Sequence, residues 1–247
     1  MEVVLMRRFA ESMAWSEDRG FAIGAAVDAR MAFVRRTYAH LLAELAAVAL
    51  VVTLAVTTPA LERFAFGLRG RWYLTLIALF GVSLVTRKML EGHRSISVQY
   101  AAAGLWVLFF GLFITPLATA AKYLTGSYAV LGEAAILTGC AFTGLTAYVF
   151  FTKKDFSFMR GALWMGSLLL FGVGIVSIVF AGGLGGGGSI VYSSFGVLLM
   201  GGWVLHDTSK VLHHRHVSEY VAASVDLLVD FVYMFIHIAS ILLNSRR

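Results

Sequence analysis

The chain has 247 residues, of which 59% are hydrophobic and 14% are charged, and its mean hydropathy is +0.81. An ordinary soluble domain is about 45–50% apolar and about 25% charged. A single soluble core could not bury this much apolar surface, so the composition favours a membrane protein. The formal net charge of +6 is spread along the chain, which indicates membrane topology and not nucleic-acid binding.

The first 37 residues carry charge throughout and contain no long apolar run. We therefore expect no cleavable signal peptide there, but a cytoplasmic tail with an amphipathic, arginine-bearing segment at the membrane surface. The tail, residues 1–37, would precede a transmembrane domain, residues 38–247. No second domain and no internal repeat is evident.

Seven continuous apolar runs follow the tail, each close to the length of about 20 residues that crosses the hydrocarbon layer. Continuous runs favour helices, because β-barrel strands alternate polar and apolar residues. We therefore predict an all-α membrane protein. The expected spans are approximately 38–58, 72–90, 97–117, 129–151, 160–181, 189–207 and 220–243.

The positions of lysine and arginine predict the orientation of the spans. Most of the chain's 20 Lys and Arg residues fall on the same side as the N-terminal tail. By the positive-inside rule the N-terminus is cytoplasmic, and seven spans then place the C-terminus outside. Arg246 and Arg247 argue against an external C-terminus, so a re-entrant last helix is an alternative. The expected location is a bacterial cytoplasmic membrane, and an organelle membrane would give the same pattern.

Two aspartates lie inside the last apolar run. Asp230 is about 15 Å into a helix that begins near Tyr220, given a rise of about 1.5 Å per residue. An ionised Asp at that depth costs about 2.5–3.5 kcal/mol on insertion scales, so it must be paired, protonated or turned into the bundle. Asp226 shares its helix face, and the same stripe continues through Tyr233 and His237. We infer a polar stripe enclosed by the other six helices.

A third aspartate, Asp207, ends the sixth predicted span. The connection to the seventh span is short, so the two helices should be neighbours and Asp207 can approach Asp226 or Asp230. Two close carboxylates tend to share a proton, which makes a pH sensor. Deprotonated, they offer the hard oxygen ligands that Ca²⁺ prefers. The structural alternatives are an interfacial Asp226, a hydrogen-bonded Asp230 in the core and an ordinary helix-end Asp207.

Three further features have a functional and a structural interpretation. Glu44, near the start of the first span, either partners the aspartates or snorkels to the interface, which is slightly favoured. Residues 213–216 (HHRH) resemble a metal-binding tract but match no zinc spacing, so a solvated cytoplasmic loop is favoured. Residues 183–188 (GLGGGG) satisfy G-x-G-x-x-G without a βαβ context, which indicates a flexible loop.

The patterns of several functional classes are missing. A retinal protein needs a lysine inside the bundle, whereas the last lysine, Lys210, falls in a predicted loop. Two membrane aspartates resemble an intramembrane aspartyl protease, but Leu228 and Val229 precede Asp230 where that family has G-x-G. The zinc-protease motif H-E-x-x-H is absent. We therefore expect neither an enzyme nor a tightly bound cofactor.

Four pieces of sequence together resemble the Bax inhibitor-1 family of seven-helix membrane proteins. They are residues 33–38 (FVRRTY), residues 152–157 (TKKDFS), Tyr192 and Gly196 ahead of Asp207, and residues 228–231 (LVDF). The resemblance covers roughly residues 30–243. It implies a central last helix wrapped by the other six and a pH-sensitive calcium leak, with the lipid bilayer and calcium ions as partners.

The resemblance also implies roles for individual residues. Asp207 and Asp230 would form a hydrogen-bonded pH sensor that contacts the passing Ca²⁺, and an arginine of the second helix would latch onto it in the closed state. Arg87 is the candidate for this arginine, and Arg94 is the fallback. Some relatives have a second ion pair between an acid of the second helix and an arginine near the end of the last helix. Here the second helix has no acid before Arg87, and the arginine position falls near Ser240.

Asp226, His237 and Glu44 are expected as accessory residues around the sensor. A competing hypothesis holds that the protein conducts no ions and modulates a membrane protease or a cell-death factor. The resemblance to some members of the family implies such a role. The long N-terminal tail and the histidine-rich loop would then be the interacting features. A proton-coupled transporter is a third option, although no substrate pocket is evident in the sequence.

Overall fold

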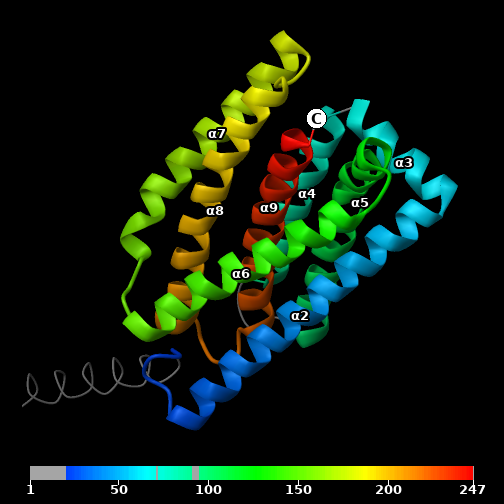
Figure 1. The fold of residues 1–247 in the computed structure, drawn as a ribbon. Coiled ribbons are helices and arrows are strands. Elements are labelled where there is room, and N and C mark those ends of the chain that lie inside the picture. The colour runs from blue at the N-terminus through cyan, green and yellow to red at the C-terminus, as the bar shows by residue number, and fades with distance from the viewer. Residues whose placement is uncertain (1–20, 71, 91–94, 247) are drawn as a thin grey trace, which may run out of the picture.

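The computed structural model describes residues 21–70, 72–90 and 95–246. Within these ranges the chain is almost entirely helical, with no β-strand and one antiparallel bridge between Phe21 and His216. A single 3₁₀ turn, Ser157–Met159, precedes α7. The α-helices are α2 (Val27–Thr57), α3 (Pro59–Gly70), α4 (Trp72–Leu90), α5 (Ile96–Thr125), α6 (Ala129–Thr152), α7 (Arg160–Ala181), α8 (Gly186–His213) and α9 (Tyr220–Ser245) (Figure 1).

Seven of these helices, all except α3, are long and apolar enough to cross a membrane. The predicted all-α, seven-span fold is therefore confirmed. Several helices extend beyond the predicted spans. The clearest case is α8, which continues to His213 and so places Asp207 and Lys210 inside a helix. The prediction that Lys210 lies in a loop is wrong.

Helix α3 is an element that the sequence did not reveal to us. It occupies the stretch between the first two predicted spans, which we expected to be a loop. Its first residue is Pro59, and the fixed φ of proline suits the first helical position, where no backbone N–H is needed. A proline directly after the apolar run of the first span was therefore the available signal.

Glycines terminate two of the spanning helices. Gly126 after α5 and Gly182 after α7 adopt φ values of 73° and 65°, in the left-handed region that favours glycine. The glycine-rich stretch that follows is divided between two structures. Gly185 precedes α8, while Gly186, Gly187 and Gly188 form its first turn. The expectation of a flexible loop over residues 183–188 is therefore wrong for its second half.

Helix α9 lies at the centre of the packing, although fewer helices surround it than the resemblance implied. It packs against α8, α6, α2 and α5, whereas α4 packs mainly on α5 and α7 mainly on α8 (Figure 1). A last helix wrapped by all six others is therefore not confirmed. The main core is formed by large apolar side chains of α2, α5, α8 and α9, including Phe33, Leu41, Phe110, Val204, Leu227 and Leu228.

The course of α9 bears on the position of the C-terminus. It is one continuous helix of 26 residues, long enough to cross the hydrocarbon layer at about 1.5 Å per residue. It ends at the opposite end of the bundle from the start of α2 (Figure 1). A re-entrant last helix is therefore contradicted. Which end faces the cytoplasm stays a prediction, as does the division into a tail and a membrane domain, because residues 1–20 lie outside the described part.

Candidate functional site

The three aspartates gather where α8 and α9 pack together, near the end of the bundle at which these two helices are connected. Asp207 on α8 and Asp230 on α9 are buried, with 9% and 4% of their surface exposed. Asp226 lies one turn before Asp230 on α9. The predicted approach of Asp207 to the α9 acids is thus supported, since both Asp207 and Asp226 lie within electrostatic reach of Asp230.

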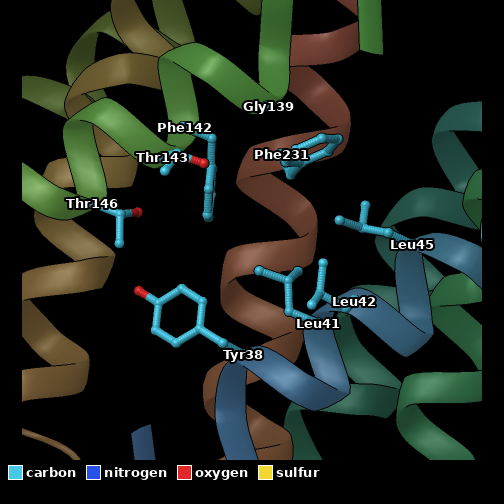
Figure 2. A pocket seen from close by; sticks show the side chains of 9 residues that line it. All are labelled: Tyr38, Leu41, Leu42, Leu45, Gly139, Phe142, Thr143, Thr146 and Phe231. Atoms are coloured by element: carbon cyan, nitrogen blue, oxygen red, sulfur yellow. The ribbon is translucent and has the colours of Figure 1, made fainter. Parts of the chain in front are cut away.

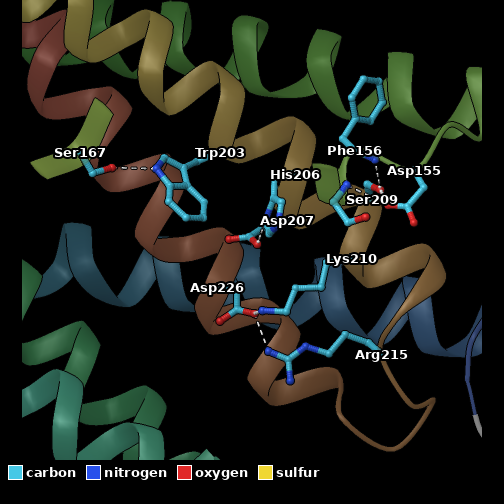
Figure 3. Close-up of polar contacts among 11 residues, drawn as sticks. Asp155, Phe156, Ser167, Trp203, His206, Asp207, Ser209, Lys210, Arg215 and Asp226 are labelled. Carbon is cyan, nitrogen blue, oxygen red and sulfur yellow. Dashed lines mark hydrogen bonds and ion pairs between the residues drawn. The ribbon is translucent and has the colours of Figure 1, made fainter. Parts of the chain in front are cut away.

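Asp226 is held by two cations (Figure 3). Lys210 Nζ donates to Asp226 Oδ2 at 2.9 Å, and Arg215 Nη2 donates to the same oxygen at 2.5 Å. The Asp226 side chain is 26% exposed and that of Arg215 16%. Asp226 is therefore a partly buried member of two ion pairs, which the interfacial interpretation did not include.

Arg215 lies in the connection between α8 and α9 and is charged at any ordinary pH. Burial alone would lower its pKa, but the carboxylates of Asp226, Glu219 and Asp207 outweigh burial and raise it. Glu219 lies 3.8 Å from Arg215 Nη1 and also accepts a hydrogen bond from the backbone N–H of His216. The connection is therefore pinned to the bundle, and the expectation of a merely solvated loop is wrong for Arg215.

Asp207 has a different partner from the one that the resemblance implied. His206 Nδ1 lies 2.8 Å from Asp207 Oδ1, and the imidazole ring packs edge-on against Trp203. No hydrogen bond joins Asp207 to Asp230 among the described residues. Asp230 Oδ2 is instead buried without any hydrogen-bond partner in that part of the chain. Burying a carboxylate oxygen without a hydrogen-bond donor costs free energy, so Asp230 is the least stabilised carboxylate of the cluster.

Glu44 points inward from α2 and contacts α9. It is 8% exposed, and its Oε1 accepts a hydrogen bond from Ser224 Oγ at 2.8 Å. The favoured snorkelling orientation is wrong, because Ser224 offers a donor within the bundle. Ser224 lies two residues before Asp226, so Glu44 joins the carboxylates along the first turns of α9 without pairing directly with an aspartate.

His237 continues the polar stripe of α9, two turns beyond Asp230. Its ring lies 5.8 Å from that of Tyr192, measured between centroids, and packs directly over Gly196. An added Cβ at Gly196 would meet the ring at 2.4 Å. The predicted accessory histidine therefore makes the close contact between α8 and α9 at the level of Gly196, away from the ion pairs.

The arginine latch stays a prediction. Arg87 is exposed on α4, a helix that packs against α3 and α5. Arg94 lies outside the described residues. Within the described part of the chain, Lys210 and Arg215 bond to the cluster through Asp226, and sequence reasoning missed both. The available signals were the spacing of Lys210, which follows Asp207 by three residues and shares its helix face, and the shortness of the connection that carries Arg215.

A second polar junction ties the end of α6 to α8. His214 Nε2 lies 2.8 Å from Asp155 Oδ2. Ser209 Oγ donates to Asp155 Oδ1 at 3.2 Å, as Figure 3 shows. The backbone N–H of Phe156 in turn donates to Ser209 Oγ at 2.9 Å. This junction fixes the connection between α6 and α7 against α8, beside the ion pairs of Asp226.

The assignment of Asp207 and Asp230 as contacts of a Ca²⁺ ion stays a prediction. The described part of the chain has no group of three or more His, Cys, Asp or Glu side chains arranged to hold a metal ion. Two or three carboxylates with separate partners fall short of the six to eight oxygen ligands of a Ca²⁺ site.

Comparison with known proteins places the chain in a family. The model of the family described as "Inhibitor of apoptosis-promoting Bax1" matches residues 30–247. The chain belongs to the Bax inhibitor family. It is 29% identical to Protein lifeguard 4 of Mus musculus, over 88% of this chain and 87% of that protein. It is 27% identical to the Golgi anti-apoptotic protein of Vaccinia virus over 90% of each chain, and 28% identical to Bax inhibitor 1 of Schizosaccharomyces pombe over 86% and 76%.

The sequence pieces that carry the resemblance to the Bax inhibitor family lie at structurally important points. Phe33 is fully buried in the main core, Gly196 admits the His237 ring, and Asp155 holds the second polar junction. The names of the family and of the viral relative refer to apoptosis. Membership establishes a multi-pass membrane protein of this family. What the protein does is a matter for proposal.

Proposed function

We propose that this protein is a pH-sensitive calcium leak, in which Asp207 and Asp230 are the titrating groups that gate passage of the ion. The observation that carries the proposal is Asp230, buried at membrane depth with one oxygen unpartnered and with Asp207 and Asp226 nearby. Such a group responds to protons and to cations, because either would neutralise a carboxylate that lacks a donor.

The geometry supports distinct roles for the three aspartates. Asp226 is already neutralised by Lys210 and Arg215, so it anchors the connection between α8 and α9. Asp207 lies close enough to Asp230 to act on it electrostatically. Neither is bonded to a lysine or arginine among the described residues, and Asp207 is bonded to His206. In the proposed closed state the two aspartates share a proton, and deprotonation makes them repel each other and attract a hard cation. Movement of α8 against α9 would then open the path.

Calcium flux into proteoliposomes across pH 6 to 8 tests this proposal. The wild type is compared with Asp230→Asn, which keeps the shape of the side chain but removes the titrating group. Glu133→Gln serves as the matched control, because Glu133 is an exposed acid paired with Arg246 at the other end of the bundle. We expect a pH-dependent leak whose pH response is lost in Asp230→Asn and kept in the control. Equal flux and equal pH response in all three proteins would refute it.

The latch assignment is tested in the same assay. The family resemblance suggests Arg87, whereas the contacts favour Arg215 as the cation that holds the acidic cluster closed. Arg215→Ala is therefore compared with Arg87→Ala. A raised leak at neutral pH in only one of the two variants identifies the latch. Unchanged flux in both would show that no arginine latch operates.

A second candidate function is that of a non-conducting partner of a membrane protease or a cell-death factor. The names of the relatives and two contacts of the N-terminal segment favour it. The backbone N–H of Ala22 donates to Arg215 O at 2.9 Å, and the tilted ring of Phe21 lies 4.2 Å from that of His216, measured between centroids. The N-terminal segment thus reaches the connection that carries the ion pairs. Removing residues 1–20 should abolish partner binding and leave calcium flux intact if this second function is correct. Loss of flux on truncation would argue against a separate partner role.

A further inference from the structure

A laterally open groove lies between α2 and α6, with α9 as its floor. Its volume is about 340 Å³, near the lower end of the range of about 300–1,000 Å³ typical of small-molecule sites. Helices α2 and α6 each contribute four lining residues, and Phe231 of α9 closes the base (Figure 2). The two walls are not packed extensively on each other. Because both belong to spanning helices, the groove opens toward the acyl chains of the bilayer.

The lining of the groove is apolar and carries no charge. Leucines of α2 face Phe142 of α6 and Phe231 of α9, and the polar lining residues are Tyr38, Thr143 and Thr146. A phosphate or carboxylate head group would find no cation among these lining residues. The chemistry therefore fits a hydrocarbon chain along most of the groove and an uncharged polar group at one end.

That end holds hydroxyl groups that lack partners. The hydroxyls of Thr146 and Thr208 approach that of Tyr38, yet all three are buried without a satisfactory hydrogen bond in the described part of the chain. Figure 2 shows the Tyr38 hydroxyl directed toward Thr146. On the same helix, Thr138 and Thr152 donate to the carbonyl four residues earlier, at 2.7 and 2.8 Å. Thr146 has no such hydrogen bond in the described part of the chain, and its oxygen, like that of Tyr38, has almost no accessible surface. A ligand therefore reaches these hydroxyls only when the side chains turn into the groove.

We propose that this groove binds a neutral, hydroxyl-bearing, single-chain lipid of the monoacylglycerol type. Its chain would lie along the leucines of α2 and the aromatic rings of α6 and α9. Its hydroxyl or ester oxygens would supply the missing partners of Tyr38 and Thr146. Buried polar groups without partners are costly, so a ligand that satisfies them gains selectivity over one that does not. This proposal stands independently of calcium conduction.

Gly139 offers a way to fill the groove without disturbing the fold. It lines the groove, and a Cβ added to it would meet no atom within 4 Å. Gly144 on the same helix is also open at its Cβ position but does not line the groove. Gly139→Leu and Gly144→Leu are therefore a matched pair of substitutions. Tyr38→Phe and Thr146→Val remove the hydroxyls at nearly constant volume.

The test is photo-crosslinking of the full chain in phosphatidylcholine nanodiscs. The probes are a photoactivatable monoacylglycerol, a photoactivatable fatty acid and a photoactivatable phosphatidylcholine, each at the same mole fraction. We expect the monoacylglycerol to label residues 38–45 and 139–146 most strongly. Gly139→Leu should lower this labelling at least fivefold and Gly144→Leu should leave it unchanged. Tyr38→Phe and Thr146→Val should each lower it about fivefold, the worth of one hydrogen bond.

Three results would overturn the proposal. One is equal labelling by the three probes, which would show lipid contact without recognition of the polar group. Another is unchanged labelling in Gly139→Leu, which would place the lipid elsewhere. The third is full labelling in both Tyr38→Phe and Thr146→Val, which would show that the hydroxyls do not bind the ligand. Tyr38→Phe and Thr146→Val are nearly isosteric with the wild type and should fold normally. The proposal can therefore still be refuted if Gly139→Leu fails to fold.

Discussion

Arg215 and Asp226 form a short, partly buried ion pair that fastens the connection between α8 and α9 to the second turn of α9. Nη2 of the arginine lies 2.5 Å from Oδ2 of the aspartate, and Lys210 Nζ reaches the same oxygen at 2.9 Å. One carboxylate thus receives a cation from α8 and another from the connection. The arrangement neutralises an acid placed one turn from Asp230, so the α9 acids differ in their electrostatic surroundings despite their shared helix face.

Arg215→Ala should destabilise the protein more than Lys210→Ala does. Removing one member of a buried ion pair leaves an uncompensated charge, at a cost of about 3–5 kcal/mol when burial is complete. Asp226 is partly exposed, so we expect about 1–3 kcal/mol for Arg215→Ala. The Lys210 side chain is 36% exposed, and its removal should cost less than about 1 kcal/mol. Thermal unfolding in detergent measures both, and a larger loss for Lys210→Ala would contradict the assignment.

The double variant Arg215→Met, Asp226→Leu is the control for that comparison. It removes both charges and keeps apolar volume, and such replacements of buried pairs are often neutral or stabilising. We expect its stability to exceed that of Arg215→Ala alone. If it is lower, packing of the arginine stem and not the charge would explain the loss.

Much of the fold was predictable from the sequence, because apolar run length reports directly on membrane spans. The class, the seven spans and the inward orientation of Asp230 all follow from hydropathy and from the cost of a charge in hydrocarbon. The extension of α8 past Asp207 was not predictable in that way. Its last turn is polar, and the turn is helical because Lys210 finds Asp226 on another helix.

The partners of the acids were the least predictable part of the site. Helix periodicity places Asp226 and Asp230 on one face but does not show which cation reaches which oxygen. Glu44 illustrates the difficulty, since its orientation depends on Ser224, a residue 180 positions away in the sequence. Close contacts between helices were equally hidden, as only the three-dimensional packing shows that Gly196 admits the His237 ring.

Gly196→Ala should be distinctly destabilising. A Cβ there would lie 2.4 Å from the His237 ring, and the ring is confined between α8 and α9. Overpacking of this kind costs about 1–3 kcal/mol. Gly201→Ala on the same helix is the control, because its Cβ would meet only Leu145 at an ordinary 3.5 Å. Thermal unfolding should separate the two variants, and Gly196→Ala should recover when combined with His237→Ala. Equal stability of the two single variants would exclude a tight contact at Gly196.

Asp155→Asn should leave the pH dependence of flux between pH 6 and 8 unchanged. Partial burial alone would raise the pKa of Asp155, but hydrogen bonds from Ser157 and His214 outweigh it and lower the pKa to about 2. A carboxylate with a lowered pKa contributes stability that is present above its ordinary pKa of about 3.9 and lost as the pH falls toward 2. It stays ionised throughout the assay window. A shifted flux midpoint in Asp155→Asn would show that this junction takes part in the gating.

Ser224→Ala should destabilise the protein through Glu44 and not through lost packing. The serine hydroxyl is the donor to Glu44 Oε1, and Glu44 Oε2 is already buried without a partner among the described residues. Removing the donor leaves both oxygens unsatisfied, at about 1–3 kcal/mol. The double variant Glu44→Leu, Ser224→Ala removes the stranded carboxylate and should be more stable than Ser224→Ala. Additive losses in a double-mutant cycle, measured by thermal unfolding, would show that the two side chains do not interact.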